Sequence, residues 1–201
     1  MRTGNGISAV ILAAGLSRRM GTPKMLLPWG ETTVLGQVVA TYTQAGVGEI
    51  VVVTGGARQQ VEAEVTRLAA SMPLCAVFNP QHEEGDMLSS LQCGLAALDG
   101  QTDAVLIGLG DQPQLSPAAL QLILAALAEN IAQLFVPSFE MHRGHPWLVR
   151  RGLWDDILTM QAPQTMRDFL NKHAGQIFYI QTDHTILKDL DTPDQYKRER
   201  P

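Results

Sequence analysis

The chain has few cysteines, few aromatic residues and no long apolar run. Its two cysteines, Cys75 and Cys93, form no C-x-x-C motif. We therefore expect no disulfide framework, two core thiols and a cytoplasmic location. Aromatic residues make up 5% of the chain, which leaves little surface for stacking bases. The apolar runs are far shorter than the roughly 20 residues that span a bilayer. We expect neither nucleic-acid nor membrane partners.

Short apolar runs alternate with helix-length segments along the first part of the chain. Strands are expected at residues 8–13, 49–54, 74–79 and 103–108, and helices at 33–45, 57–70, 87–98 and 117–129. This order is typical of a parallel sheet covered on both faces by helices. Ligands bind such sheets beyond the carboxyl ends of the strands, so the loops that begin at Gly15, Gly55, Asn79 and Gly110 should meet at one crevice.

The loop after the first strand is the most informative segment. Residues 12–24 read LAAGLSRRMGTPK, so an apolar run stops at Gly15 and a small-residue loop with Arg18, Arg19 and Lys24 follows. Small residues let backbone N–H groups approach an anion and the cations neutralise it, which predicts a polyphosphate-binding loop. The spacing matches neither G-x-x-x-x-G-K-[ST] nor G-x-G-x-x-G, which weakens kinase, ATPase and dehydrogenase interpretations.

The charge distribution supports a small anionic ligand. Residues 1–30 contain four basic residues and no acidic one, although the whole chain has a net charge of −5. A local cationic island in an acidic protein suits one small anion better than a nucleic-acid backbone, which needs a broad basic face.

The second part of the chain has a looser pattern. Strands are expected at 134–137, 146–149 and 177–180, and helices at 151–160, 165–173 and from about 192 onward. No linker, internal repeat or low-complexity tract divides the sequence, so we expect one domain over residues 1–201. Its first part, 1–130, should bind a nucleotide, and its second part, 131–201, should bind an acceptor.

Two aspartate-containing segments are candidate metal sites. Asp111 follows an apolar run, and Asp189 and Asp191 lie two residues apart on the same side of an extended segment. Each alone is compatible with an ordinary turn or helix cap. Beside a triphosphate loop, however, two carboxylates form a sufficient set of protein ligands for magnesium.

Two further segments carry polar groups. One segment surrounds a helix start and contains Asn79, Ser89 and Ser90, whose polar groups could bind a base or ribose. An ordinary helix start, with the serine hydroxyls hydrogen-bonded to nearby backbone, explains the serines as well. His142 and His145 flank Arg143, but no third zinc ligand is evident nearby. Binding of an anion or acceptor through Arg143 and His145 is the better functional interpretation.

Together these motifs resemble the MobA-like nucleotidyltransferases, and in particular their branch of molybdenum cofactor cytidylyltransferases, over nearly the whole chain. The matching points are the L-A-A-G-x-S-x-R-M-G-x-x-K signature at 12–24 with MLLPW at 25–29, TGG at 54–56, Asn79 with Gly85 and SSL at 89–91, GDQP at 110–113, GHP at 144–146 and DLDTP at 189–193. The resemblance implies a Rossmann-like three-layer α/β/α sandwich with a mostly parallel sheet, as in nucleotide-diphospho-sugar transferases. It also implies nucleotidyl transfer with release of pyrophosphate.

The resemblance assigns roles residue by residue. It implies nucleotide binding by Leu12, Ala13, Ala14, Gly15, Arg19, Lys24, Thr54, Gly55, Asn79, Gly85 and Ser90, catalysis by Arg19, Lys24 and Asp111, metal binding by Asp111 and Asp191 or Asp189, and acceptor binding by Arg143, Gly144, His145 and Asp189. The Ala-Ala-Gly of the signature favours CTP over GTP. Gln112 replaces a methionine that is common in the family, a small departure that faces the crevice.

The implied reaction moves CMP from CTP to the terminal phosphate of molybdopterin or the molybdenum cofactor, with Mg²⁺, or alternatively Mn²⁺, as the cofactor. That phosphate is already an anion, so the reaction needs no catalytic base, and positioning and charge neutralisation suffice. A recipient molybdoenzyme or its chaperone is a further expected partner. The alternatives are a transferase with another phosphate acceptor and a non-catalytic chaperone that carries the molybdenum cofactor.

Overall fold

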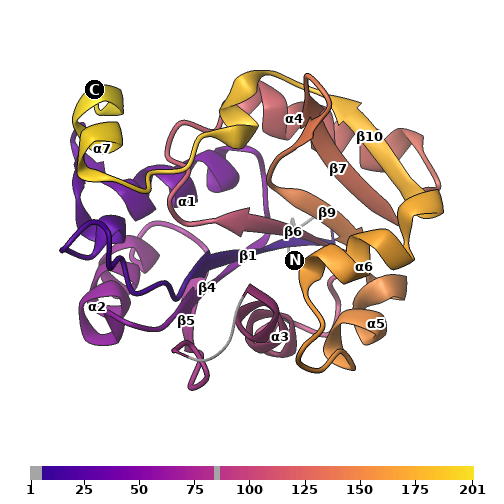
Figure 1. Ribbon diagram of the computed structural model, residues 1–201, viewed down its shortest axis with the longest axis horizontal. Coiled ribbons are helices and arrows are strands. Elements are labelled where there is room, and N and C mark those ends of the chain that lie inside the picture. The colour runs from indigo at the N-terminus through magenta and orange to yellow at the C-terminus, as the bar shows by residue number, and fades with distance from the viewer. Residues whose placement is uncertain (1–5, 84–86) are drawn as a thin grey trace.

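The computed structural model describes residues 6–83 and 87–201, and a mixed sheet runs through its centre (Figure 1). The strand order is β10-β7-β9-β6-β1-β4-β5, with β8 paired to β7. The strands are β1 (Ile7–Ala13), β4 (Glu49–Thr54), β5 (Leu74–Phe78), β6 (Ala104–Leu109), β7 (Leu134–Phe139), β8 (His142–Arg143), β9 (Trp147–Arg150) and β10 (Ile177–Gln181). Only β8 and β9 run antiparallel to their neighbours in this sheet, so the expected mostly parallel sheet is confirmed.

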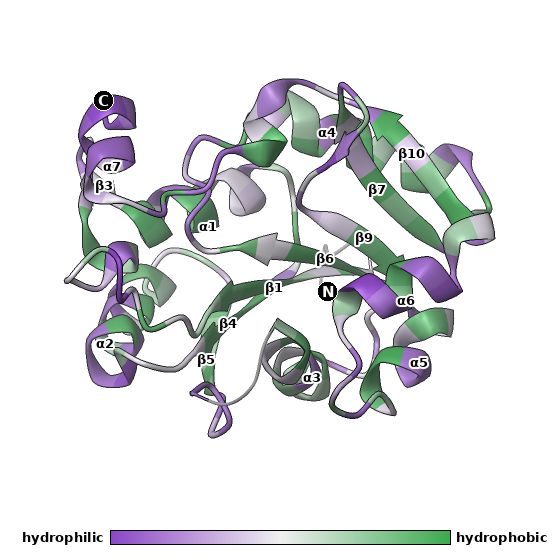
Figure 2. Cartoon of the chain, in the orientation of Figure 1, coloured by the Kyte–Doolittle hydropathy of each residue, from purple (hydrophilic) through white to green (hydrophobic). Residues whose placement is uncertain are grey.

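Helices cover both faces of the sheet and complete a three-layer α/β/α sandwich. They are α1 (Val34–Gln44), α2 (Arg58–Ala69), α3 (Met87–Ala97), α4 (Pro117–Glu129), α5 (Trp154–Leu158) and α6 (Met166–Lys172), whereas α7 (Pro193–Glu199) packs through Tyr196 on a small cluster with Trp29 and Leu190. One buried cluster joins the sheet to α1, α2 and α4, and a second joins it to α3, α5 and α6. The strands at the centre of the sheet are correspondingly mostly hydrophobic (Figure 2). Among the described residues, no helix has the length and apolar character needed to cross a membrane.

Local sequence signals explain where key helices begin. The Ser116 hydroxyl accepts a hydrogen bond from the Ala119 N–H at 3.0 Å, and Pro117 opens the first turn of α4. At α7, Thr192 and Gln195 form a reciprocal capping box. The capping box fixes the segment just before α7, and this segment carries Asp189 and Asp191.

Some details differ from the sequence-based expectations. The expected helix at 151–160 is a 3-10 turn, Arg151–Leu153, followed by the shorter α5. A small hairpin of β2 (Pro28–Trp29) and β3 (Thr32–Thr33) was not expected. The prediction of two core thiols was wrong, because Cys75 is exposed on β5 at the sheet edge and Cys93 is only partly buried.

Helix α3 packs directly on the sheet because Gly94 has no side chain. A Cβ added at Gly94 would lie 2.9 Å from Val53 Cγ2 and closer still to Val10 Cγ1. This close packing holds α3 against β1 and β4.

We predict that Gly94→Ala destabilises the protein by about 1–3 kcal/mol, because the added methyl overpacks the interface between α3 and the sheet. The matched control is Gly100→Ala, since a Cβ there meets no atom within 4 Å. Urea unfolding of both variants measures the difference. Equal stability of the two variants would contradict the packing argument.

Candidate active site

The loop after β1 is held in shape by Ser17. This residue has a positive φ of 49°, and its carbonyl accepts hydrogen bonds from the N–H groups of Met20 (2.9 Å) and Gly21 (3.2 Å). Its hydroxyl accepts a further bond from the Lys24 N–H at 3.2 Å. Ser17 therefore sets the course of the loop that carries Arg19 and Lys24. It belongs to the signature at 12–24, yet we assigned it no role from sequence.

The loops after neighbouring strands meet at one edge of the sheet, as expected. The Gly56 N–H donates to the Ala14 carbonyl at 3.2 Å, and the Gly110 N–H donates to the Leu12 carbonyl at 2.9 Å. Gly55 is buried against Ala14, whose carbonyl a Cβ at position 55 would strike. Gly15 is different, because it is exposed and a Cβ there would meet none of the described atoms within 4 Å. The space beside Gly15 is thus open to a ligand.

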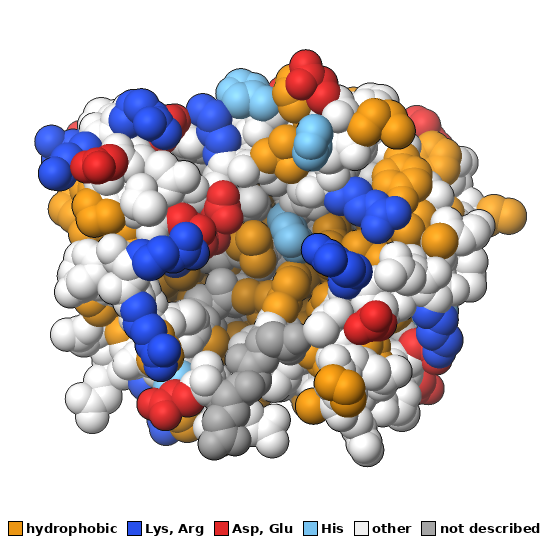
Figure 3. Space-filling model, viewed as in Figure 1, with side chains coloured by type: hydrophobic (Ala, Val, Ile, Leu, Met, Phe, Trp, Pro, Cys, Tyr) orange, Lys and Arg blue, Asp and Glu red, His pale blue; other side chains and the backbone are white. Residues whose placement is uncertain are grey.

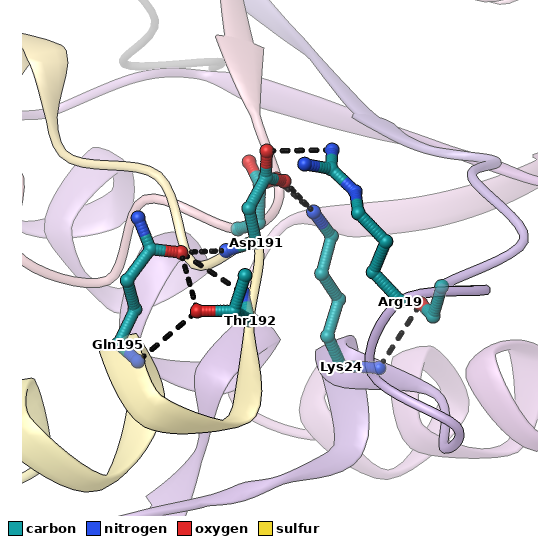
Figure 4. A network of polar contacts seen from close by, with 7 residues as sticks. Arg19, Lys24, Asp191, Thr192 and Gln195 are labelled. Carbon is teal, nitrogen blue, oxygen red and sulfur yellow. Dashed lines mark hydrogen bonds and ion pairs between the residues drawn. The ribbon is translucent and has the colours of Figure 1, made fainter.

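Four charged side chains from distant parts of the chain converge beside this loop. The Lys24 ammonium lies between the carboxylates of Asp111, in close contact, and Asp191, at 3.2 Å. Arg19 reaches the other oxygen of Asp191 at 2.7 Å (Figure 4). The side chains of Lys24 and Asp111 are each 13% exposed, whereas that of Arg19 is 70% exposed. Figure 3 shows acidic and basic side chains gathered around a hollow in this face of the molecule.

The two carboxylates differ in their electrostatic environment. Burial raises the pKa of Asp111, and the nearby Asp189 adds to this effect, while Lys24 only partly offsets it. Burial also acts to raise the pKa of Asp191, but hydrogen bonds and charge from Lys24 and Arg19 outweigh it and lower that pKa. Burial acts to lower the pKa of Lys24, yet the two aspartates outweigh it and raise the pKa. Lys24 is therefore held as a cation in this cluster.

The segment that carries Asp191 is anchored on both sides. The Leu190 N–H donates to the Asp111 carbonyl at 3.0 Å, and the Leu190 side chain is buried. The Asp191 N–H donates to Oε1 of Gln195 at 3.0 Å, within the capping box of α7 (Figure 4). Asp189 lies on the same side of this segment but is exposed, and it forms no described ion pair with Lys24. Gln195 is a supporting residue that the sequence did not reveal.

The predicted base and ribose residues form a closed polar network. Asn79 is 2% exposed, and its amide donates to the hydroxyls of Ser89 and Ser90, each at 3.0 Å. Its Oδ1 accepts from the Gln81 N–H at 2.9 Å, so the amide ties the loop after β5 to α3. Thr54 is fully buried, and its hydroxyl donates to Glu62 at 3.2 Å. Gly85 lies outside the described residues.

The predicted acceptor residues lie farther along the same edge, near β7, β9 and β10. The Arg143 guanidinium donates to the Tyr179 hydroxyl at 2.5 Å. Gly144 packs so closely on Ile186 that a Cβ would lie 2.7 Å from Ile186 Cβ. The His145 ring stacks on Trp147 with 4.6 Å between centroids. These three residues therefore lie on the side of Asp111 away from the loop at 12–24.

The donor set fits a divalent cation bound together with phosphate. Oxygens of Asp111 and Asp191 already face one positive charge, the Lys24 ammonium. Mg²⁺ is usually held by one or two carboxylates plus substrate phosphates and waters. The described residues contain no cluster of three or more metal-binding side chains, so this centre would depend on ligand oxygens.

Alanine substitution of Gly55 and of Gly15 should distinguish a glycine that the fold needs from one that ligand binding needs. Gly55→Ala should lower the thermal midpoint by several degrees, because the methyl meets the Ala14 backbone and lies 2.7 Å from His82 Cβ. Gly15→Ala should leave the midpoint unchanged but weaken nucleoside triphosphate binding about tenfold or more, since the methyl fills the open space. Calorimetric titration gives the affinity, and wild-type affinity in Gly15→Ala would contradict a phosphate site there.

Comparisons with known proteins identify the family. Residues 9–177 match the family described as MobA-like NTP transferase domain. The chain is 28% identical to the molybdenum cofactor cytidylyltransferase of Escherichia coli K12 over 193 residues, covering 96% of this chain and 94% of the relative. It is 30% identical to nicotine blue oxidoreductase of Paenarthrobacter nicotinovorans over 200 residues, covering 96% and 95%.

Solved structures agree with this match. The crystal structure of Rv0371c from Mycobacterium tuberculosis H37Rv superimposes with a TM-score of 0.82 at 29% identity, over 98% of each chain. Rv0371c in complex with manganese superimposes with a TM-score of 0.76 at 28% identity, over 96% of each chain. The family match covers most of the chain, and the chain belongs to the MobA-like NTP transferase family of nucleotidyltransferases.

Proposed function

We propose that this nucleotidyltransferase moves CMP from CTP to the terminal phosphate of molybdopterin or the molybdenum cofactor and releases pyrophosphate. The observation that carries the proposal is the cluster in which Lys24 joins Asp111 and Asp191 beside the open loop at Gly15. This cluster offers cations for a triphosphate and carboxylates for a metal within one crevice. The similarity to the cytidylyltransferase of E. coli supports the choice of substrates.

Arg19 and Lys24 have the chemistry to bind the triphosphate. Both cations are paired with carboxylates, and they would turn to the phosphates once nucleotide enters. Their charge would stabilise the negative charge that develops on the departing pyrophosphate. Arg19 is the more exposed of the two, so it would meet the nucleotide at the mouth of the crevice.

Asp111 and Asp191 would hold the divalent cation, with Mg²⁺ as the proposed ion. The bound metal would neutralise phosphate charge during transfer. The manganese complex of Rv0371c supports a divalent cation in this family, and Mn²⁺ is a natural substitute. The attacking phosphate of the acceptor is an anion at neutral pH, so no side chain has to remove a proton from it. Positioning of the two substrates at one sheet edge supplies the remainder of the catalysis.

The preference for CTP is proposed from Ala13, Ala14 and Gly15, which match the pattern of cytidylyltransferases in the family. Ala14 is 7% exposed and its carbonyl accepts the Gly56 N–H, so the loop lies close to the end of β4 at this point. The acceptor is proposed to lie on the opposite side of Asp111, along Asp189 and residues 143–145. A molybdoenzyme or its chaperone would then receive the product.

Pyrophosphate release tests this function directly. Purified protein is incubated with CTP or GTP and Mg²⁺, with and without molybdenum cofactor, and pyrophosphate is measured. We expect release only with CTP and the cofactor. Release with a different phosphate acceptor would identify a related transferase, and cofactor binding without any release would identify a carrier. Either result would overturn the proposal.

We predict that Asp111→Ala lowers Mg²⁺-dependent pyrophosphate release by at least about 10²-fold, because the developing charge loses its metal site. Fold stability should change little, since burial raises the pKa of this carboxyl and makes its charge unfavourable. Asp194→Ala is the matched control, because Asp194 is 94% exposed on α7. Near wild-type turnover of Asp111→Ala would refute the metal assignment.

A further inference from the structure

The loop between α4 and β7 presents an apolar side chain to solvent. Ile131 is 96% exposed, the highest fraction among the large hydrophobic side chains of the described residues. A single apolar residue on a surface needs no explanation, so its surroundings decide whether it has a role. Ile131 borders an open hollow of about 380 Å³, lined by residues 130–133 and 175–178. These two short segments form what we call the β10 patch, which combines an apolar projection with a hollow.

The loop that carries Ile131 has a well-supported backbone. The Arg150 guanidinium donates to the backbone carbonyls at positions 127, 130 and 132, at 2.8, 2.8 and 2.9 Å. The Gln133 side-chain amide donates to the Ile131 carbonyl at 3.3 Å. A projecting side chain on a backbone held in this way is preorganised, which lowers the entropy cost of binding a partner.

The β10 patch lies beside a free edge of the sheet. Strand β10 ends the strand order and pairs with β7 alone among the described residues (Figure 1). The strand, Ile177–Gln181, contains no charged residue, proline or glycine, and its Phe178 and Tyr179 are 38% and 42% exposed. Charges, proline and covering segments are the usual means of blocking an edge strand, and an edge without them can pair with another chain.

The charge pattern favours a second copy of this chain as that partner. Residues close to the two-fold axis of a symmetric dimer face their own counterparts, so a charged residue there would meet a like charge. Residues 130–133 and 175–178 include no charged residue, although 17% of the chain is charged. Arg150 is bonded to backbone carbonyls, and Arg143 contacts Tyr179 farther along β10.

We propose that the β10 patch is the interface of a symmetric dimer, in which Ile131 of each copy enters the hollow of the other. The two β10 edges then lie next to each other. A rotation of 180° exchanges projection and hollow, so a patch that has both is complementary to itself. Ile177 and Leu134 pair at the start of β10 and β7, and β7 runs in the direction of β6. The dimer therefore forms away from the carboxyl ends of the strands and leaves both crevices open.

Analytical ultracentrifugation of the full chain tests this interface. At about 1–100 µM the wild type should move from one to two times the chain mass of 21.9 kDa. Ile131→Asp should raise the dimer Kd about tenfold or more, because two carboxylates would face an apolar interface. Ile131→Leu, which keeps the apolar projection, should dimerise like the wild type. The matched control is Met141→Asp, since Met141 is 89% exposed on the turn between β7 and β8 and lies outside the patch.

A second variant tests the hollow without adding charge. Gly175 lines the hollow, and a Cβ there would meet none of the described atoms within 4 Å. Gly175→Leu should therefore fold normally, fill the hollow and raise the dimer Kd about tenfold. Gly100→Leu is its control, because a Cβ at Gly100 is equally free and the β6 that follows is separated from β10 by β9 and β7. Far-UV circular dichroism checks that each variant is folded.

Several results would overturn the inference. They are a wild-type monomer at about 100 µM, a dimer that neither Ile131→Asp nor Gly175→Leu weakens, and an equal loss of dimer in Met141→Asp or Gly100→Leu. A wild-type monomer that binds the apolar dye ANS, with binding lost in Ile131→Asp, would assign the β10 patch to another apolar ligand and would also overturn it. Sedimentation requires no substrate, so these results are independent of the proposed function.

Discussion

The bridge from Lys24 to Asp111 and Asp191 is the interaction on which the site depends. It joins the loop after β1, the loop after β6 and the segment before α7, three parts of the chain that are distant in sequence. Two carboxylates close to one another repel, and the ammonium between them compensates for that repulsion. Arg19 adds a second cation on the solvent side. The cluster thus keeps its cations and carboxylates within reach of one another, as the proposed binding of a metal and a triphosphate requires.

The sheet topology separates the two proposed binding regions along one edge of the sheet. The loops after β1, β4 and β5 form the side where a nucleotide is proposed, and β7, β9 and β10 carry the residues proposed for the acceptor. Asp111 follows β6, which lies between these two groups of strands. A transfer reaction needs both substrates at one point, and the central position of β6 makes its carboxyl end the natural place for transfer.

Much of this arrangement is predictable from the sequence because it depends on local patterns and one general rule. The apolar runs and helix caps locate β1, β4, β6 and α4, and parallel strands bring their carboxyl ends to one edge. Other features depend on tertiary contacts that no pattern encodes. The exposure of Cys75 follows from strand order, and the choice of Asp191 over Asp189 as the partner of Lys24 follows from how the extended segment packs.

Anomalous diffraction at the manganese edge, from crystals that contain CTP and Mn²⁺, tests the proposed metal centre directly. We expect a manganese peak bound by Asp111 and Asp191, with the Lys24 ammonium moved from the carboxylates to the phosphates. A peak bound elsewhere, or Lys24 still between the two aspartates with nucleotide present, would contradict it.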